Sequence, residues 1–340
     1  MRARSQSHAL PRMGGLFALL ALTLAACAPS SADAPIPEQW RSVAVDVRPV
    51  ALGAQQIGAL RFRGGLDLRS EDAAFGGFSD LEVLEDGRVI AVSDAGLWLS
   101  ARLALDDTGA LKGLDQPRLA MMRDEHGQVF EEKRNGDAED LAQLPDGRFA
   151  VAFETTQTIR LYDLNRDGPF GAALAGPPLA GTARLAENVG LEALASTADG
   201  ALVVGAEQGG RAGAPVWRTP LDSSAPAEPA THFSLPLGFG FSGLDRLPDG
   251  NFVSLERLYA PLIGARIRLS VLDAAALEAG QIRKTQLALL ASPLSLDNFE
   301  GVSVARAPDG GVRLYLISDN NFDRRERTLL YAFDVVASPR

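Results

Sequence analysis

Residues 296–325, LDNFEGVSVARAPDGGVRLYLISDNNFDRR, predict a β-hairpin. Apolar residues alternate on both sides of Asp309-Gly310. An Asp-Gly pair between two apolar runs is a strong signal of a tight turn, because glycine adopts the positive φ that the turn needs. A hairpin brings its two open ends together. Here those ends carry oxygen-bearing side chains, namely Asp297, Asn298 and Glu300 on one side and Ser318, Asp319, Asn320, Asn321 and Asp323 on the other.

The same arrangement occurs five times along the chain. Asp-Gly turns flanked by apolar runs begin at Asp86, Asp146, Asp199, Asp249 and Asp309. Each hairpin is followed by one or two further strand candidates, so every repeat of about 50 to 60 residues holds about four strands, which is the pattern of a β-propeller blade. The sequence therefore predicts an all-β fold, a β-propeller with five blades. A sixth blade, built largely from residues 41–75, stays open as an alternative.

The last repeat is one strand short. It has a third strand candidate at residues 329–335 but too little chain for a fourth. Two strand-like runs, residues 42–52 and 57–68, precede the first repeat and have no hairpin of their own. A strand from this N-terminal part would complete the final blade, close the ring and remove its exposed edges. We also expect that residues 272–286 could hold a short helix.

The first 26 residues predict a signal peptide. Three arginines precede an apolar run, residues 14–26, that is too short to span a bilayer as a mature helix. The run ends directly before Cys27, the only cysteine, in a sequence that resembles a bacterial lipobox. This resemblance implies cleavage before Cys27 and lipidation of its thiol. An ordinary secretory signal with an incidental cysteine is the alternative.

The predicted organisation is therefore a lipoprotein of the bacterial cell envelope. Residues 27–40 form a flexible tether, and residues 41–340 form a single domain on the periplasmic side of a membrane, attached only through the lipid on Cys27. We expect a monomer. Cleavage leaves 30 basic and 43 acidic residues, a formal charge of −13. This acidic balance disfavours nucleic acid as a partner and favours divalent cations, although acidity also aids solubility.

Acidic residues recur at matching distances from the five turns, on both arms of each hairpin. Equal arms place these residues opposite each other at the open end. On the first arm the positions are Ser79, Glu139, Glu192, Ser242 and Glu300, with Asp80 and Asp140 one place further in. On the second arm they are Asp94, Glu154, Glu207, Glu256 and Asp319.

These positions predict an acidic mouth at one end of the propeller axis, because the first strand of each blade lines that axis. So many carboxylates repel one another unless cations neutralise them, and hard oxygen ligands suit Ca²⁺. Acidic residues that only cap the strand ends are the alternative. The predicted metal ligands are Glu139, Asp140, Glu192, Glu207, Glu300, Asp319 and Asn320.

Several blocks of the chain resemble the phytase-like family, whose members are called "esterase-like activity of phytase" proteins. One is DAEDLAQLPDGRFAVAFE (137–154), and the most specific is the final block, which contains DNFEGVSVA (297–305) and LYLISDNNF (314–322). The resemblance covers about residues 70–336. It implies an exported bacterial β-propeller with a Ca²⁺-lined mouth that acts on phosphoesters.

Candidates for catalysis at such a mouth are Glu192, Glu300, Arg257 and Arg324. The chain has three lysines, so arginines that follow the acidic positions, including Arg211, would have to hold phosphate. Two further readings stay open. One is a non-catalytic envelope propeller with structural Ca²⁺, and the other is a lactonase-like hydrolase of a small-molecule ester. The two histidines of the mature chain, His126 and His232, are far apart, which disfavours a histidine zinc site, and the absence of a G-x-S-x-G motif disfavours a Ser-His-Asp esterase.

Overall fold

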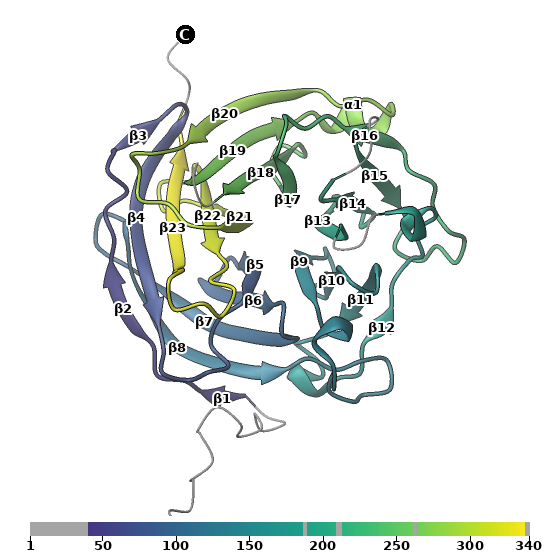
Figure 1. The fold of residues 1–340 in the computed structure, drawn as a ribbon, viewed down its shortest axis with the longest axis horizontal. Helices are drawn as coiled ribbons and strands as arrows, with labels where there is room; N and C mark the ends of the chain where they lie inside the picture. The colour runs from purple at the N-terminus through teal and green to yellow at the C-terminus, as the bar shows by residue number, and fades with distance from the viewer. Residues whose placement is uncertain (1–39, 186–188, 209–212, 261–263, 337–340) are drawn as a thin grey trace, which may run out of the picture.

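The computed structural model describes residues 40–185, 189–208, 213–260 and 264–336. Their strands form five antiparallel sheets arranged in a ring around one axis (Figure 1). This confirms the predicted five-bladed propeller, and the described part of the chain contains no sixth blade. The predicted signal peptide, Cys27, nearly all of the tether and Arg211 lie outside the described residues.

Each of the first four blades follows one hairpin repeat, with its first strand innermost. Blade 1 contains β5 (Phe78–Val83), β6 (Arg88–Ser93), β7 (Leu97–Leu105) and β8 (Leu111–Met121), with β1 (Arg41–Ser42) at its outer edge. Blade 2 contains β9 (Ala138–Gln143), β10 (Phe149–Phe153), β11 (Thr158–Tyr162) and β12 (Leu174–Ala175). Blade 3 contains β13 (Leu191–Ser196), β14 (Leu202–Ala206), β15 (Ala214–Thr219) and β16 (Thr231–Phe233). Blade 4 contains β17 (Gly240–Arg246), β18 (Phe252–Ala260), β19 (Gly264–Leu272) and β20 (Lys284–Leu290).

Blade 5 is completed by the N-terminal part of the chain, as predicted. It contains β21 (Phe299–Arg306), β22 (Val312–Ser318), β23 (Thr328–Val335) and β4 (Leu60–Arg69), with β2 (Asp46–Pro49) and β3 (Gln56–Ile57) beside β4. Strand β4 pairs antiparallel with β23, and Leu66 faces Leu330 in this register. Strand β1 instead pairs with β8 of blade 1. The N-terminal segment therefore holds the first and last blades together.

The predicted short helix is α1 (Ala274–Glu278), which begins after Asp273, whose side chain accepts a hydrogen bond from the Ala276 N–H. Three single 3-10 turns lie at Lys133–Asn135, Gly168–Phe170 and Thr182–Arg184. Among the described residues, no helix has the length and apolar character needed to cross a membrane.

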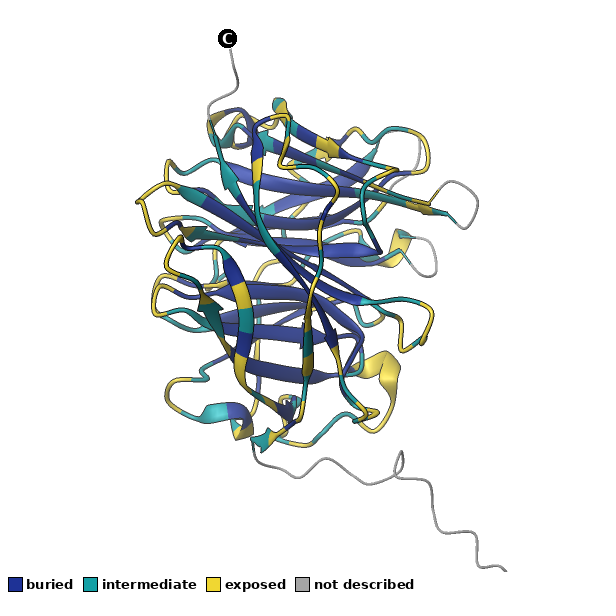
Figure 2. Cartoon of the chain, turned by 90° about the vertical axis from the view of Figure 1, so that its left-hand side faces the viewer, coloured by how far each residue is buried: buried dark blue, intermediate teal, exposed yellow. Residues whose placement is uncertain are grey.

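The apolar core lies between neighbouring blades, in five layers. Strands are buried along most of their length, and exposed residues concentrate in the connecting loops (Figure 2). Trp98 of blade 1, for example, is fully buried against Tyr162 of blade 2, with ring centroids 5.1 Å apart. Burying one large apolar side chain contributes about 1.5–3 kcal/mol. The layers therefore hold the domain together without a disulfide.

The five Asp-Gly turns all lie at the same end of the axis. Their glycines, at positions 87, 147, 200, 250 and 310, have φ between 79° and 90°. This is the left-handed backbone that favours glycine. The open ends of the five hairpins consequently lie together at the opposite end, where the sequence predicts the acidic mouth.

Candidate metal and active site at the axial mouth

A β-bulge recurs in the inner hairpin of every blade, next to the open end. The bulged residues, each an extra residue of the inner strand without a direct partner, are Ser79, Glu139, Glu192, Ser242 and Glu300. A bulge bends the strand and re-aims the extra side chain. These are the five first-arm positions that the turn spacing singled out, so the bulge is the local structure that gives them a common role. We call them the inner ring.

A second set of five residues surrounds the inner ring. Each comes from the second strand of a hairpin, at or just past the end of its pairing with the inner strand. This outer ring consists of Asp94, Glu154, Glu207, Arg257 and Asp319. Four members are acids that we predicted for the mouth, and the fifth is an arginine.

The prediction that Glu256 faces the mouth is wrong. Its side chain is fully buried on the other face of β18, where Lys284 Nζ lies 2.9 Å from Oε1 and Arg268 Nη1 lies 3.6 Å from Oε2. Successive residues of a strand point to opposite faces, so a choice of 256 instead of 257 selects the wrong face. The signal was present in the sequence, because the outer-ring residues of blades 1 to 4 all lie eight positions after the turn aspartate.

Arg257 links several members of the two rings. Its guanidinium donates hydrogen bonds to Ser242 Oγ and Asn298 Oδ1, both at 3.1 Å. Its Nη2 lies 3.0 Å from Glu300 Oε1, 3.8 Å from Glu207 and 3.9 Å from Glu192. Burial opposes its charge, but these carboxylates outweigh that effect and raise the pKa of Arg257. Arg257 therefore stays charged and orders the side of the mouth formed by blades 3, 4 and 5.

The blade 2 side of the mouth holds a close group of carboxylates. Asp137, Glu139 and Glu154 each offer one oxygen, and these oxygens lie within 4.8 Å of one another. We did not predict Asp137. It stands two positions before the bulge, where blades 1, 3 and 4 have Gly77, Gly190 and Gly240 and blade 5 has Asn298, so a comparison of the repeats at this position could have found it.

Two of those glycines leave room for outer-ring acids of the preceding blade. A Cβ on Gly190 would lie 2.1 Å from Glu154 Cγ, and a Cβ on Gly240 would lie 2.5 Å from Glu207 Oε1. Any side chain at these two positions would displace the acid. The small residues thus let Glu154 and Glu207 lie against the next blade.

Burial and mutual repulsion raise the pKa values of several mouth carboxylates. Desolvation is the largest cause for Glu139, and the charges of Glu192 and Glu300 raise its pKa further. Desolvation also raises the pKa of Glu154 to about 7 and holds the pKa of Asp319 well above its usual range. Ionising these groups together is unfavourable unless positive charge is added.

The mouth residues fit a hard divalent cation. Their ligand atoms are oxygens, and in the described part of the chain the only cations paired with ring carboxylates are Arg257, itself a member of the outer ring, and Lys133. Lys133 Nζ lies 2.6 Å from Asp94 Oδ2, while the other oxygen of Asp94 is buried without a hydrogen-bond partner. An oxygen-rich, negatively charged cluster with an unsatisfied carboxylate oxygen suits Ca²⁺.

Three residues predicted for the site lie elsewhere or have other partners. Asp140 lies one place further along β9, and its two oxygens accept hydrogen bonds from the N–H groups of Leu194 at 2.7 Å and Leu141 at 2.6 Å. Asn320 Oδ1 accepts a hydrogen bond from the Gly77 N–H at 2.9 Å, which connects blades 5 and 1. Arg324 is exposed in the loop between β22 and β23, where it lines a separate pocket of about 550 Å³.

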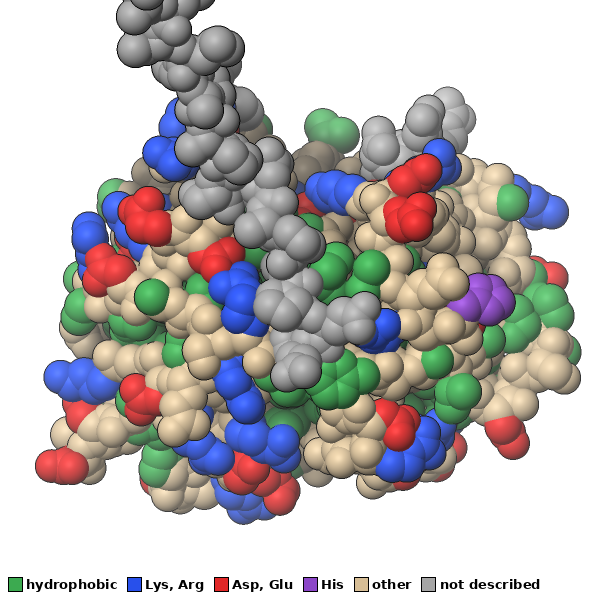
Figure 3. All heavy atoms as spheres, turned by 90° about the horizontal axis from the view of Figure 1, so that it is seen from below, with side chains coloured by type: hydrophobic (Ala, Val, Ile, Leu, Met, Phe, Trp, Pro, Cys, Tyr) green, Lys and Arg blue, Asp and Glu red, His purple; other side chains and the backbone are tan. Residues whose placement is uncertain are grey.

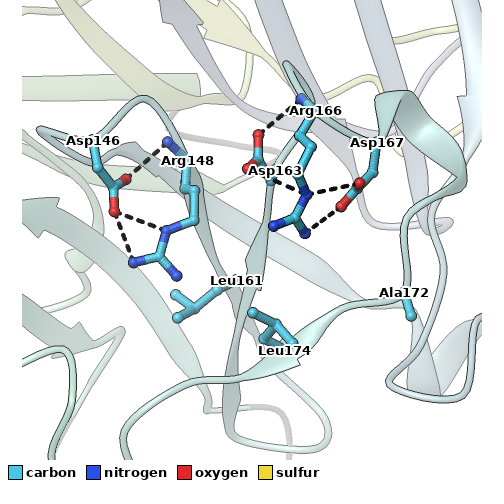
Figure 4. Close-up of a pocket in the computed structure, with 8 residues that line it drawn as sticks. All are labelled: Asp146, Arg148, Leu161, Asp163, Arg166, Asp167, Ala172 and Leu174. Atoms are coloured by element: carbon cyan, nitrogen blue, oxygen red, sulfur yellow. Dashed lines mark hydrogen bonds and ion pairs between the residues drawn. The ribbon is translucent and has the colours of Figure 1, made fainter.

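The described residues away from the mouth include no second group of three His, Cys, Asp or Glu side chains placed to share a metal ion. Figure 4 shows a pocket of about 310 Å³ beside the Asp146 turn of blade 2, and its charges are paired. Arg148 lies 2.8 Å from Asp146, and Arg166 lies 2.6 Å from Asp167. On the side of the molecule seen in Figure 3, basic and acidic side chains are interspersed over the surface. Neither surface has the concentrated charge of the two rings.

The fold and the mouth together define a five-bladed β-propeller with an acidic axial site. Residues 73–322 match the model of the phytase-like family, described as "Esterase-like activity of phytase". The chain therefore belongs to the phytase-like family, as the resemblance predicted. No curated protein matches the chain significantly.

Solved structures similar to the chain are distant propellers. A protein proposed to be a gluconolactonase has 14% identity and a TM-score of 0.45, and the match covers 89% of this chain and 100% of that one. A gluconolactonase from Xanthomonas campestris has 12% identity and a TM-score of 0.42, with 88% and 99% covered. A PQQ-bound aldose sugar dehydrogenase from Streptomyces coelicolor has 14% identity and a TM-score of 0.41, with 87% and 99% covered. Likenesses this distant carry no argument about what this chain binds or does.

Proposed function

We propose that the protein is a Ca²⁺-dependent hydrolase of phosphoesters that acts at the axial mouth. The observation that carries this proposal is the convergence of the two rings, with the Asp137–Glu139–Glu154 group at their edge. Family membership supports hydrolysis of an ester or phosphoester. Asp137, Glu139 and Glu154 would hold the ion, and Ca²⁺ bound there would polarise a phosphoryl oxygen and favour ionisation of water.

Two carboxylates on the opposite side of the mouth suit the proton transfers of hydrolysis. Burial raises the pKa of Glu300, but the hydrogen bond from Asn298 and the pair with Arg257 oppose this rise and favour its ionised form. Glu192 lies farther from Arg257, and burial and the charge of Glu207 hold its pKa well above the usual range, which favours its protonated form. Neighbouring carboxyls with different pKa values can divide the roles of base and acid.

The chemistry then follows from these roles. Glu300 accepts a proton from water while the water oxygen bonds to phosphorus. The bond from phosphorus to the ester oxygen breaks, and Glu192 gives its proton to the departing alcohol. Arg257 faces the same carboxylates and stabilises negative charge on the phosphoryl oxygens.

One observation favours a second candidate, hydrolysis of a neutral ester or lactone. Arg257 and Lys133, the cations that contact the rings in the described ranges, are already paired with carboxylates. A dianionic phosphate needs further positive charge, whereas a neutral ester does not. The same carboxylates and ion would serve this reaction.

The deciding experiment measures turnover of p-nitrophenyl phosphate, p-nitrophenyl acetate and dihydrocoumarin. Protein purified without chelator is compared with EDTA-treated protein and with protein to which Ca²⁺ is restored, and bound metal is measured by mass spectrometry. We expect phosphate release that EDTA abolishes and Ca²⁺ restores. Glu139→Gln should lower both metal content and turnover, whereas Asp146→Asn, at the turn end of the axis, should leave both unchanged.

Other outcomes separate the alternatives. Turnover of the acetate or lactone alone would favour the second candidate. A lower melting temperature in EDTA without turnover of any substrate would mean that the protein is a binding propeller with structural Ca²⁺. Full phosphate turnover by metal-free protein would refute the role of the mouth carboxylates as ligands.

We also propose, from the N-terminal sequence, that the protein is an exported lipoprotein of the cell envelope. Fractionation of cells that express the full chain tests this. The wild-type protein should sediment with membranes, and Cys27→Ser should be released into the soluble periplasmic fraction. Equal membrane association of both proteins would contradict attachment through a lipid on Cys27.

A further inference from the structure

A second pocket lies at the other end of the axis, among the Asp-Gly turns. Its volume is about 640 Å³, which is within the range of small-molecule sites. Residues from all five blades line it, including Gln143 at the end of β9 and Ser196 at the end of β13. Its apolar wall includes Leu84, Leu103 and Leu105, and the Leu105 side chain is 40% exposed.

The polar part of this pocket contains an arginine that is not neutralised. Arg246 Nε is buried without a hydrogen-bond partner, and Arg246 forms no ion pair with a described residue. This differs from Arg148 and Arg166 in the neighbouring turn region, which are paired with aspartates. A buried guanidinium N–H without an acceptor is unfavourable, so a ligand that supplies an oxygen acceptor there gains binding energy.

Three carboxylates line the same pocket: Glu85, which is exposed, and Asp245 and Glu82, which already have hydrogen-bond partners. Asp245 accepts hydrogen bonds from the N–H groups of Val304 and Arg246, both at 2.6 Å. Glu82 accepts hydrogen bonds from the Gln143 N–H at 2.8 Å and from Ser303 Oγ at 3.3 Å. Burial raises the pKa of Asp245 to about 7, which reduces its negative charge near neutral pH, and burial also holds the pKa of Glu82 well above its usual range. Arg306 and Glu85 also line the pocket but are exposed, so Arg246, whose Nε is buried, is the less solvated cation that meets a ligand.

We propose that this pocket binds a small amphipathic carboxylic acid, with the carboxylate at Arg246 and the apolar chain against the leucine wall. The charge of Arg246 selects the head group, and Leu84, Leu103 and Leu105 select an apolar tail. The pocket is formed by the turn ends of the blades, whereas the axial mouth is formed by their open ends. Binding is therefore independent of the metal and of the proposed hydrolysis.

Calorimetric titration of the folded protein with octanoate in EDTA tests the proposal, since EDTA prevents binding of octanoate through a metal. We expect saturable one-to-one binding of octanoate and at least tenfold weaker binding of acetate, 1-octanol and octylammonium. Arg246→Gln should weaken octanoate binding at least tenfold. Arg148→Gln, which removes an arginine of the same end of the molecule, should leave it unchanged.

A second variant keeps the test valid if Arg246→Gln does not fold. Leu105→Glu changes an exposed position and places a negative charge on the apolar wall, so it should also weaken octanoate binding at least tenfold. Melting temperatures of the variants serve as the control for folding. Tighter binding of octylammonium than of octanoate, an unchanged affinity in folded Leu105→Glu, or no saturable binding would overturn the proposal.

Discussion

Arg257→Gln tests the electrostatic structure of the mouth most directly. The substitution removes the ion pair of 3.0 Å with Glu300 and the guanidinium donors to Ser242 and Asn298. Removing one partner of a buried pair destabilises by about 3–5 kcal/mol, and the 20% exposure of the Arg257 side chain places the expected loss near the lower end, about 3 kcal/mol. At about 2–4 °C per kcal/mol, the melting temperature should fall by about 6 °C or more in EDTA.

The pH dependence of this loss follows from the raised pKa values of Glu192 and Glu300. The folded protein binds more protons than the unfolded chain. Its stability therefore rises as the pH falls from the raised pKa values of the folded state toward the pKa of about 4.5 in the unfolded chain. Arg257 interacts favourably with the ionised carboxylates. The stability difference between wild type and Arg257→Gln should therefore be largest above pH 7 and smaller at pH 5.

Calorimetric melting between pH 5 and pH 8, with and without Ca²⁺, measures this difference. Ca²⁺ should raise the melting temperature of Arg257→Gln more than that of the wild type, because it replaces the missing positive charge. The matched control is Arg148→Gln, whose partly exposed pair with Asp146 is worth at most about 1 kcal/mol. The reasoning is refuted if Arg257→Gln melts no lower than Arg148→Gln, or if its deficit is the same at every pH and unaffected by Ca²⁺.

Three further predictions concern the packing of carboxylates along the axis. Wild-type stability in EDTA should rise as the pH falls from 8 toward 5, because the pKa of Glu154 is raised to about 7, and added Ca²⁺ should flatten this curve; a flat curve in EDTA would contradict it. Gly190→Ala should destabilise the protein by about 1–3 kcal/mol through its Cβ contact with Glu154 Cγ, and the double variant with Glu154→Ala should recover only part of the loss in urea unfolding, because Glu154 Cα and Cβ would still lie 2.6 Å and 2.8 Å from the new Cβ. Asp140→Ala should lower the free energy of unfolding by about 1–3 kcal/mol more than Asp140→Asn, because alanine leaves the Leu194 N–H without its acceptor, and equal losses would argue against that bond.

The architecture could be derived from the sequence because its signals are local and repeated. An Asp-Gly turn needs only glycine between two apolar runs, and five such turns with four strands each define five blades. The missing strand in the last repeat indicated the closure that β4 provides, since an open edge must find a partner. The spacing from the turns also identified Glu139, Glu192 and Glu300 as equivalent positions.

Only the tertiary structure showed which side chains point into the mouth. A bulge adds one residue to the inner strand of each hairpin. The residue types at these positions do not predict it. This shift turns Glu139 toward the mouth, whereas Asp140 is hydrogen-bonded to the next blade through the Leu194 N–H. In the same way, the sheet placed Arg257 in the outer ring and Glu256 beneath Lys284.

The sequence by itself therefore predicted a closed propeller, with five blades favoured over six, and the end at which its acids gather. Only the tertiary structure decided which of those acids meet, and that Arg257 and Asp137 join them. The physical reason is that blade order follows from patterns within 50 to 60 residues. The site, in contrast, depends on one-residue shifts that change the face of a strand on which a side chain lies. It also depends on contacts between strands that are distant in the chain, such as β9 with β13 and β21 with β5.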